Sequence, residues 1–137
     1  MNQTMKKYPA EQVAVYVRVS TEDQANKQEG SLKSQRQRCS EWLKGKGYSA
    51  SDDTVRVYSE EGESGKDMDR PQFRRLMLDV RRGKVKLIVF AELSRISRSL
   101  PDFLQMSTEW ADRDVQFASI RESFIDSTSP HGRLMIA

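Results

Sequence analysis

The side chains best suited to chemistry in this 137-residue chain are one serine and four arginines. Ser20 directly follows an apolar stretch in which Arg18 stands two positions earlier, and Arg70, Arg95 and Arg98 come later in the chain. A serine hydroxyl can act as a nucleophile. A guanidinium can direct two N–H donors at the oxygens of a phosphate while the negative charge on that group spreads. This set of residues favours nucleophilic attack on a phosphate ester.

The sequence offers few residues for other catalytic mechanisms. His131 is the only histidine and lies near the end of the chain, so a histidine-based serine hydrolase triad is set aside, and the proton acceptor stays open. Cys39 is the only cysteine, which excludes an internal disulfide and a Cys/His zinc cluster. It falls in helical step with Leu32 and Leu43, so we expect a buried thiol without a functional role.

Composition indicates the general class of protein but does not identify a binding partner. Hydrophobic residues make up 36% and charged residues 31%, which is typical of one globular domain with a well-solvated surface. The net charge is only +3, so nucleic-acid binding has to be argued from where the basic residues lie. Neither an apolar run of membrane-spanning length nor a signal-sequence pattern is visible in these residues, and we expect a cytoplasmic protein without a membrane partner.

Strand and helix patterns alternate along the chain and predict the elements that must position these side chains. This order favours an α/β fold, a three-layer sandwich in which helices flank a central, largely parallel sheet. A polar loop is expected at 21–30, and Asp69 is expected to cap the helix that opens at 70. Strands are predicted at 13–19, 55–58, 85–91 (central) and 115–120, a short extended piece at 123–125, and helices at 31–46, from 70 and at 101–112.

The carboxyl ends of parallel strands meet at one edge of a sheet, where ligands gather. Ser20 follows the first strand and residues 60–64 follow the second, while Ser94, Arg95 and Arg98 follow the third. Three loops are therefore expected to converge at that edge. If residues 93–99 are helical, the two arginines at 95 and 98 share a face.

Period-two alternation places Tyr16, Arg18 and Ser20 on one face of the first strand, with the last two about 7 Å apart at Cα. The same residues also fit plainer roles. Arg18 could be an edge-strand arginine that faces water or forms a salt bridge with Glu60, and Ser20 could be a helix cap or turn serine.

Five short motifs occur in an order that resembles the catalytic domain of serine recombinases, the group of resolvases, invertases and large serine integrases. The similarity reaches residues 129–134 and so covers nearly the whole chain. The long polar loop and the LSRISRS motif look closer to large integrases. The motifs are YVRVS with TEDQ (16–24), SLKSQ (31–35), EEGESG (60–65), DRPQF (69–73) and LSRISRS (93–99).

The resemblance implies that Ser20 attacks a DNA phosphodiester and forms a phosphoserine link to the 5′ end, after which strand exchange and religation follow. It implies no metal and no cofactor, and it implies double-stranded DNA as partner with dimers that assemble into tetramers. Such enzymes belong to mobile genetic elements. The residues implied to activate the scissile phosphate are Arg18, Arg95 and Arg98, and those implied to support the pocket are Tyr16, Gln24, Gln35, Glu60, Ser64 and Arg70.

The chain departs from the family pattern at three places. Glu60 stands where an aspartate is commoner, and Ser94 stands where most members have an aspartate. A lysine often found shortly before that position is replaced, because Ala91 and Glu92 occupy the place.

We expect an N-terminal extension at 1–12, a catalytic domain at 13–128, and at 129–137 the start of a helix that leads to further C-terminal parts. Two other functions fit the same residues. One is a non-catalytic α/β module that binds phosphate or nucleic acid through its arginines, and the other is a phosphatase-like hydrolase that uses Ser20.

Overall fold

The computed structural model describes residues 8–19, 31–49, 54–61 and 70–128. The expectations for Ser20, Gln24, Ser64, the loop at 21–30 and the helix start at 129–137 concern residues outside these ranges. Among the described residues, no helix is both long and apolar enough to cross a membrane.

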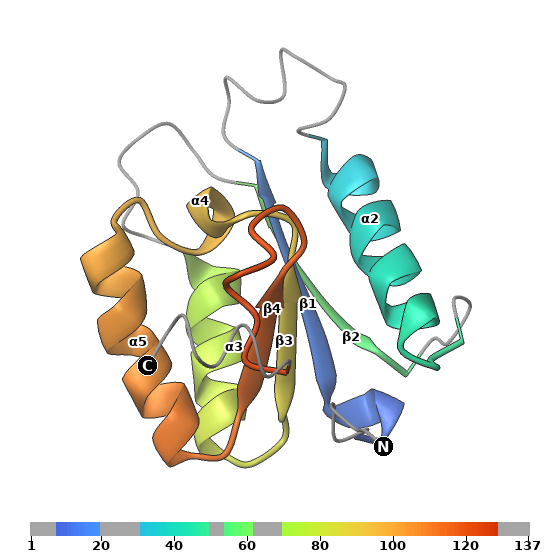
Figure 1. The fold of residues 1–137 in the computed structure, drawn as a ribbon. Helices are drawn as coiled ribbons and strands as arrows, with labels where there is room; N and C mark the ends of the chain where they lie inside the picture. The colour runs from blue at the N-terminus through green and yellow to red at the C-terminus, as the bar shows by residue number, and fades with distance from the viewer. Residues whose placement is uncertain (1–7, 20–30, 50–53, 62–69, 129–137) are drawn as a thin grey trace.

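Four parallel strands form one sheet, as the sequence predicts (Figure 1). The sheet order β2-β1-β3-β4 places β1 and β3 inside, and the expected interior position of the third strand is confirmed. The strands are β1 (Val13–Val19), β2 (Arg56–Glu61), β3 (Leu87–Phe90) and β4 (Gln116–Ser119).

Helices cover both faces of the sheet, which confirms the three-layer sandwich (Figure 1). Three valines of β1, at 13, 15 and 17, pack with Cys39 and Leu43 of α2 (Leu32–Gly45), while Tyr16 packs on the opposite face. That second face is covered by α3 (Pro71–Arg81) and α5 (Leu100–Asp112), which contribute Leu76 and Trp110. Alternation along β1 therefore fills two cores with one strand. A short 3-10 helix, η1 (Ala10–Gln12), precedes β1.

The segment 93–99 is not one continuous helix, which is the condition for Arg95 and Arg98 to share a helix face. Only α4 (Leu93–Ile96) is helical, and Ser97 is extended. The Ser97 hydroxyl bonds the backbone N–H and C=O of Ser99, which offers the chain an alternative to another helical turn. The Ser99 hydroxyl in turn caps α5 by accepting from the N–H of Asp102.

Two smaller expectations also need correction. Residues 123–125 form turns and a bend rather than an extended piece, and the chain then returns beside β4 through an antiparallel bridge between Ala118 and Asp126. The N-cap of α3 is Arg70, without a side-chain cap, whereas Asp69 lies outside the described residues.

The sheet order reverses direction between β1 and β3. The chain passes from β1 to β2 through α2 on one face, and from β2 to β3 through α3 on the other face. Loops diverge at such a switch point and leave a crevice at the carboxyl ends of the two strands. Helix α4 lies at this edge of the sheet (Figure 1).

Candidate active site

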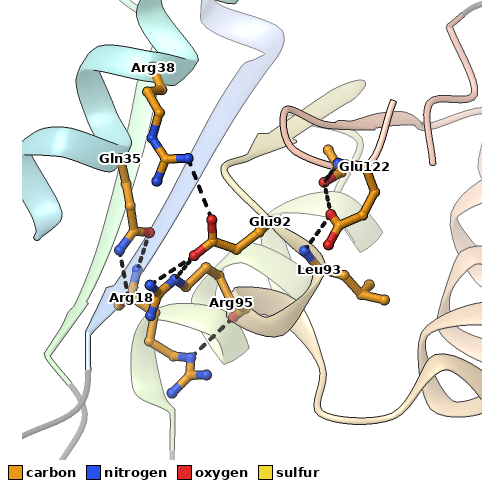
Figure 2. Close-up of polar contacts among 8 residues, drawn as sticks. Arg18, Gln35, Arg38, Glu92, Leu93, Arg95 and Glu122 are labelled. Carbon is orange, nitrogen blue, oxygen red and sulfur yellow. Dashed lines mark hydrogen bonds and ion pairs between the residues drawn. The ribbon is translucent and has the colours of Figure 1, made fainter. Parts of the chain in front are cut away.

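The backbone of Arg18 is held by a buried glutamine at the point where β3 ends. The pairing of β1 with β3 stops at Tyr16 and Phe90, while its pairing with β2 continues to Val19. Beyond Tyr16, the Gln35 side chain supplies the hydrogen bonds to β1 that β3 no longer makes. Its Oε1 accepts from the Arg18 N–H at 3.1 Å, and its Nε2 donates to the Arg18 C=O at 2.9 Å (Figure 2). A fully buried amide therefore fixes the end of β1.

The guanidinium of Arg18 crosses the switch point to the C-terminal end of α4. Its Nε donates to the C=O of Arg95 at 3.1 Å, and its Nη2 donates to the C=O of Ser94 at 2.8 Å. Arg70 adds a third donor, from Nη1 to the C=O of Arg95 at 3.3 Å. The last carbonyls of a helix lack intrahelical partners and carry partial negative charge, so cations are favourable there. These contacts use only two of the five N–H donors of Arg18.

Glu60 organises the neighbouring strand end. Its carboxylate accepts from the Tyr16 hydroxyl at 3.0 Å and from the N–H groups of Phe73 at 2.9 Å and Gln72 at 3.3 Å. It therefore caps α3 from β2, in place of a residue next to the helix. Burial raises the pKa of the Tyr16 hydroxyl well above its usual value; Arg70 opposes this shift and Glu60 adds to it. Tyr16 accordingly stays a protonated donor.

Arg70 is further held by an aromatic ring. Its guanidinium carbon lies 4.2 Å from the ring centroid of Phe73, and that ring packs edge-on against Tyr16 at 5.4 Å. Cation–π contact and the bond to α4 together place this arginine beside Arg18.

Four arginines from three parts of the chain meet at this edge. Burial lowers the pKa of Arg18, and the positive charges of Arg70, Arg95 and Arg98 lower it further, while Tyr16 acts in the opposite direction. Arg95 is buried and Arg98 is exposed. These two residues do not share a helix face, because α4 ends at Ile96 and the condition of a helical 93–99 is not met.

An ion-pair network that the sequence reasoning did not assign holds Arg95. Its Nε and Nη2 donate to Oε2 of Glu92 at 2.9 Å and 2.8 Å, and Oε1 of Glu92 lies 3.5 Å from Nη1 of Arg38 on α2 (Figure 2). Two features of the sequence could have indicated this network. One is a carboxylate directly after an apolar strand, and the other is an arginine three residues after Gln35 on the same helix face.

The loop after β4 supports the other end of α4. The Glu122 carboxylate accepts from the N–H of Leu93 at 2.9 Å and from the hydroxyl of Ser119, as Figure 2 shows for the first contact. The backbone N–H of Arg121 bonds the C=O of Ala91 at 2.9 Å. Helix α4 thus has a carboxylate at its N-terminus and two guanidinium groups at its C-terminus, both favourable for the helix dipole.

The plainer reading of Arg18 is corrected by this geometry. Arg18 is not on an edge strand, since β1 lies between β2 and β3. Glu60 is its partner in strand register, but the carboxylate bonds Tyr16 and α3. The part of the chain that the structure describes contains no group of three or more His, Cys, Asp or Glu able to hold a metal ion. The predicted roles of Ser20, Gln24 and Ser64 lie outside the described residues.

Comparison with known sequences gives consistent matches. The model of the resolvase N-terminal domain matches residues 13–137. A Bacillus subtilis (strain 168) protein named "Putative DNA recombinase" is 32% identical over 125 residues, 91% of this chain and 23% of that protein. A Sinorhizobium fredii protein named "Probable DNA-invertase" is 32% identical over 117 residues, 85% of this chain and 32% of that protein. The chain therefore spans about a quarter to a third of the length of these relatives.

Solved structures share the fold. The crystal structure of the N-terminal catalytic domain of TP901-1 integrase matches with a TM-score of 0.75 and 31% identity, over 90% of this chain and 88% of that one. A resolvase family site-specific recombinase from Streptococcus pneumoniae matches with a TM-score of 0.64 and 28% identity, over 90% of this chain and 79% of that one.

Proposed function

This chain belongs to the resolvase family, as an N-terminal domain of that family, and we propose that it is the catalytic domain of a site-specific DNA recombinase with Ser20 as nucleophile. The observation that carries the proposal is the gathering of four arginines beside the carboxyl end of β1, the strand that Ser20 directly follows in sequence. Mutual repulsion makes such a cluster costly on its own, and a bound phosphate anion relieves that cost.

In the proposed reaction the Ser20 hydroxyl gives its proton to a base, and its oxygen attacks the phosphorus of a DNA phosphodiester. A serine–phosphate bond to the 5′ end forms, the bond from phosphorus to the 3′ oxygen breaks, and that oxygen leaves as a 3′ hydroxyl after taking up a proton. Attack by a 3′ hydroxyl on the phosphoserine reverses the step after strand exchange. The covalent link conserves the phosphodiester energy, so the reaction needs no metal, nucleotide or other cofactor.

Arg18, Arg95 and Arg98 are proposed to bind the scissile phosphate and to stabilise its charge in the transition state. Donors that are already oriented stabilise developing charge without reorganising at the moment of reaction. Arg18 meets that condition because Gln35 holds its backbone and α4 holds its guanidinium. Arg70 is proposed to support it from the same helix end.

The remaining predicted residues are proposed to support the pocket. Tyr16 and Glu60 join β1 to α3 and so place Arg70, while Gln24 and Ser64 are proposed to line the same site. The partner is proposed to be double-stranded DNA, bound by dimers that assemble into a tetramer. We favour a large integrase over a small resolvase as the parent protein, encoded by a bacterial or phage mobile element.

Trapping the covalent intermediate tests the proposal. The full-length protein is incubated with sheared genomic DNA from the organism that encodes it, quenched with SDS, and the protein-linked DNA is sequenced. Wild type is expected to yield an adduct that maps to Ser20 after nuclease digestion, and the joined sequences identify the cleavage site. Ser20→Ala is expected to bind that site without forming the adduct, while Ser59→Ala, at an exposed serine of β2, forms it normally.

The outcomes separate the three functions. Binding without any adduct in wild type would favour a non-catalytic phosphate-binding module, and release of 5′ phosphate ends without rejoining would favour a hydrolase. An adduct that persists in Ser20→Ala would refute the choice of nucleophile.

The arginines are tested by separating rate from affinity. Arg98→Ala removes an exposed side chain and should slow adduct formation more than it weakens binding, because transition-state contacts appear in the rate. Arg82→Ala is the matched control, since it removes a guanidinium from the opposite end of α3. Equal losses of rate and affinity in Arg98→Ala would indicate simple docking of phosphate.

A further inference from the structure

We propose that Glu92 is a positioning residue, which sets the orientation of Arg95 and ties it to helix α2 through Arg38; this inference rests on the function proposed above. Both partners of the central ion pair are almost enclosed, with 11% of the Glu92 side chain and 10% of the Arg95 side chain exposed. A buried charge is tolerated only when it is paired. If either side chain turned away, the other would lose a charged partner inside the protein.

The geometry of the pair decides which edge of Arg95 faces the site. Oε2 of Glu92 takes both Nε at 2.9 Å and Nη2 at 2.8 Å, so the edge formed by these two nitrogens is committed to the carboxylate. Nη1 is consequently turned away from Glu92. A planar guanidinium with one edge fixed is oriented as a whole, which is what bidentate recognition of phosphate requires.

Helix α2 thereby reaches the arginine cluster at two points. Gln35 bonds the backbone of Arg18, and one turn later Arg38 contacts Glu92, which holds Arg95 (Figure 2). The contact from Arg38 is longer, at 3.5 Å, and its side chain is 31% exposed, so it is the weaker of the two links to Glu92. A single helix face sets the positions of two of the proposed phosphate ligands.

The charge of Glu92 makes the proposal distinguishable from an ordinary structural role. A carboxylate beside a phosphate site repels the anion, yet here it also orients a guanidinium that should stabilise the transition state. Removing the charge should therefore leave DNA binding unchanged or tighter while it slows cleavage. Loss of a merely structural ion pair would lower both together.

Glu92→Gln in the intact protein tests this separation. The probe is a short duplex that carries the cleavage site recovered from wild-type adducts, and both its dissociation constant and the single-turnover rate of adduct formation are measured. We expect the rate to fall by about 10-fold to 100-fold, the size of effect that a misplacement near 1 Å produces. Affinity should stay the same or rise. Glu92→Asp keeps the charge on a shorter side chain and should restore part of the rate.

Glu109→Gln is the matched control. Glu109 also accepts from two arginines, Arg81 at 2.8 Å and Arg113 at 3.2 Å, but it joins α3 to α5 on the surface. Its loss should change neither the cleavage rate nor the affinity. A Glu92→Gln rate equal to or faster than wild type would overturn the proposal, as would parallel losses of rate and affinity.

A spectroscopic readout keeps the proposal independent of recombinase activity. In protein labelled with 15N-arginine, the Nε–H of Arg95 should give a slowly exchanging resonance, assigned by its absence in Arg95→Lys. Arg38→Gln should perturb this resonance mildly, and Glu92→Gln or Glu92→Asp should shift it strongly. An Arg95 resonance that is indifferent to both substitutions at Glu92 would refute the positioning role even if Glu92→Gln folds poorly. Failure of wild type to form any adduct would instead refute the proposed function.

Discussion

Gln35 makes the clearest prediction about the fold of the site. It is fully buried, and both ends of its amide bond the backbone of Arg18, where β3 no longer pairs with β1. Replacement by leucine keeps the approximate size of the side chain and removes both hydrogen-bonding groups. The N–H and C=O of Arg18 would then lose their partner in the folded state.

The expected cost follows from these two groups. A buried backbone group left unsatisfied costs about 1–3 kcal/mol, so two of them cost about 2–6 kcal/mol. Arg18 itself is half-buried, which lets water replace part of the lost bonding. We therefore expect Gln35→Leu to lower the free energy of unfolding by about 2–4 kcal/mol.

Urea unfolding followed by circular dichroism measures this loss. The midpoint should fall while the slope with denaturant stays unchanged, since the surface exposed on unfolding is the same. Gln37→Leu is the matched control, because it lies on the same helix but is exposed, and it should change stability by no more than about 0.5 kcal/mol. A loss below about 1 kcal/mol in Gln35→Leu would refute the reasoning that this amide completes the strand.

Three further outcomes are expected. Tyr16→Phe removes a bond to the Glu60 carboxylate and should cost about 1.5–3 kcal/mol in urea unfolding; no loss would contradict the contact. Burial raises the pKa of the Cys39 thiol to about 12, so iodoacetamide at pH 8 should modify folded protein far more slowly than unfolded protein. Because the folded pKa is the higher one, the stabilising effect of the neutral thiol is full below about pH 8.5 and is lost as pH rises toward 12. Hydrogen bonding to Arg81 lowers the pKa of Glu109, so Glu109→Gln should cost under about 1 kcal/mol at neutral pH, and its difference from wild type should vanish in acid, as titration by calorimetry would show.

The residue pattern alone was enough to predict a strand or helix wherever a segment follows one periodicity. The alternation at 13–19 predicted β1 at its observed bounds. Successive side chains of this strand enter two different cores, so the pattern could be read from the segment alone. The helix expected at 31–46 is α2, and Ser31 caps it by accepting from the N–H of Ser34. For residues 93–99 the pattern left the helix conditional, and α4 ends at Ile96 because the Ser97 hydroxyl bonds the backbone of Ser99.

The topology of parallel strands placed the arginines at the expected edge, and the family resemblance implied their roles, but neither supplied their partners. Glu60 was predicted as a pocket residue and as a possible salt-bridge partner of Arg18, but its contacts with Tyr16 and the start of α3 needed the packing of β2 beside β1. Likewise, Glu92 was noted only because it replaced a lysine. Its pairing with Arg95 became visible when α4 was placed over the end of the sheet.

By itself the sequence determined the order of strands and helices along the chain and the parallel sheet. It also determined the edge of that sheet at which Arg18, Arg70, Arg95 and Arg98 gather. These follow from periodicity, turn residues and the topology of parallel strands, which are local or general properties of a chain. Tertiary structure decided how the arginines are held. Arg38 and Glu92 are 54 residues apart, and Gln35 and Arg18 are 17 apart, so these contacts exist only when α2 and α4 pack against the same sheet edge. The periodicity of one segment does not show which distant segment packs against it.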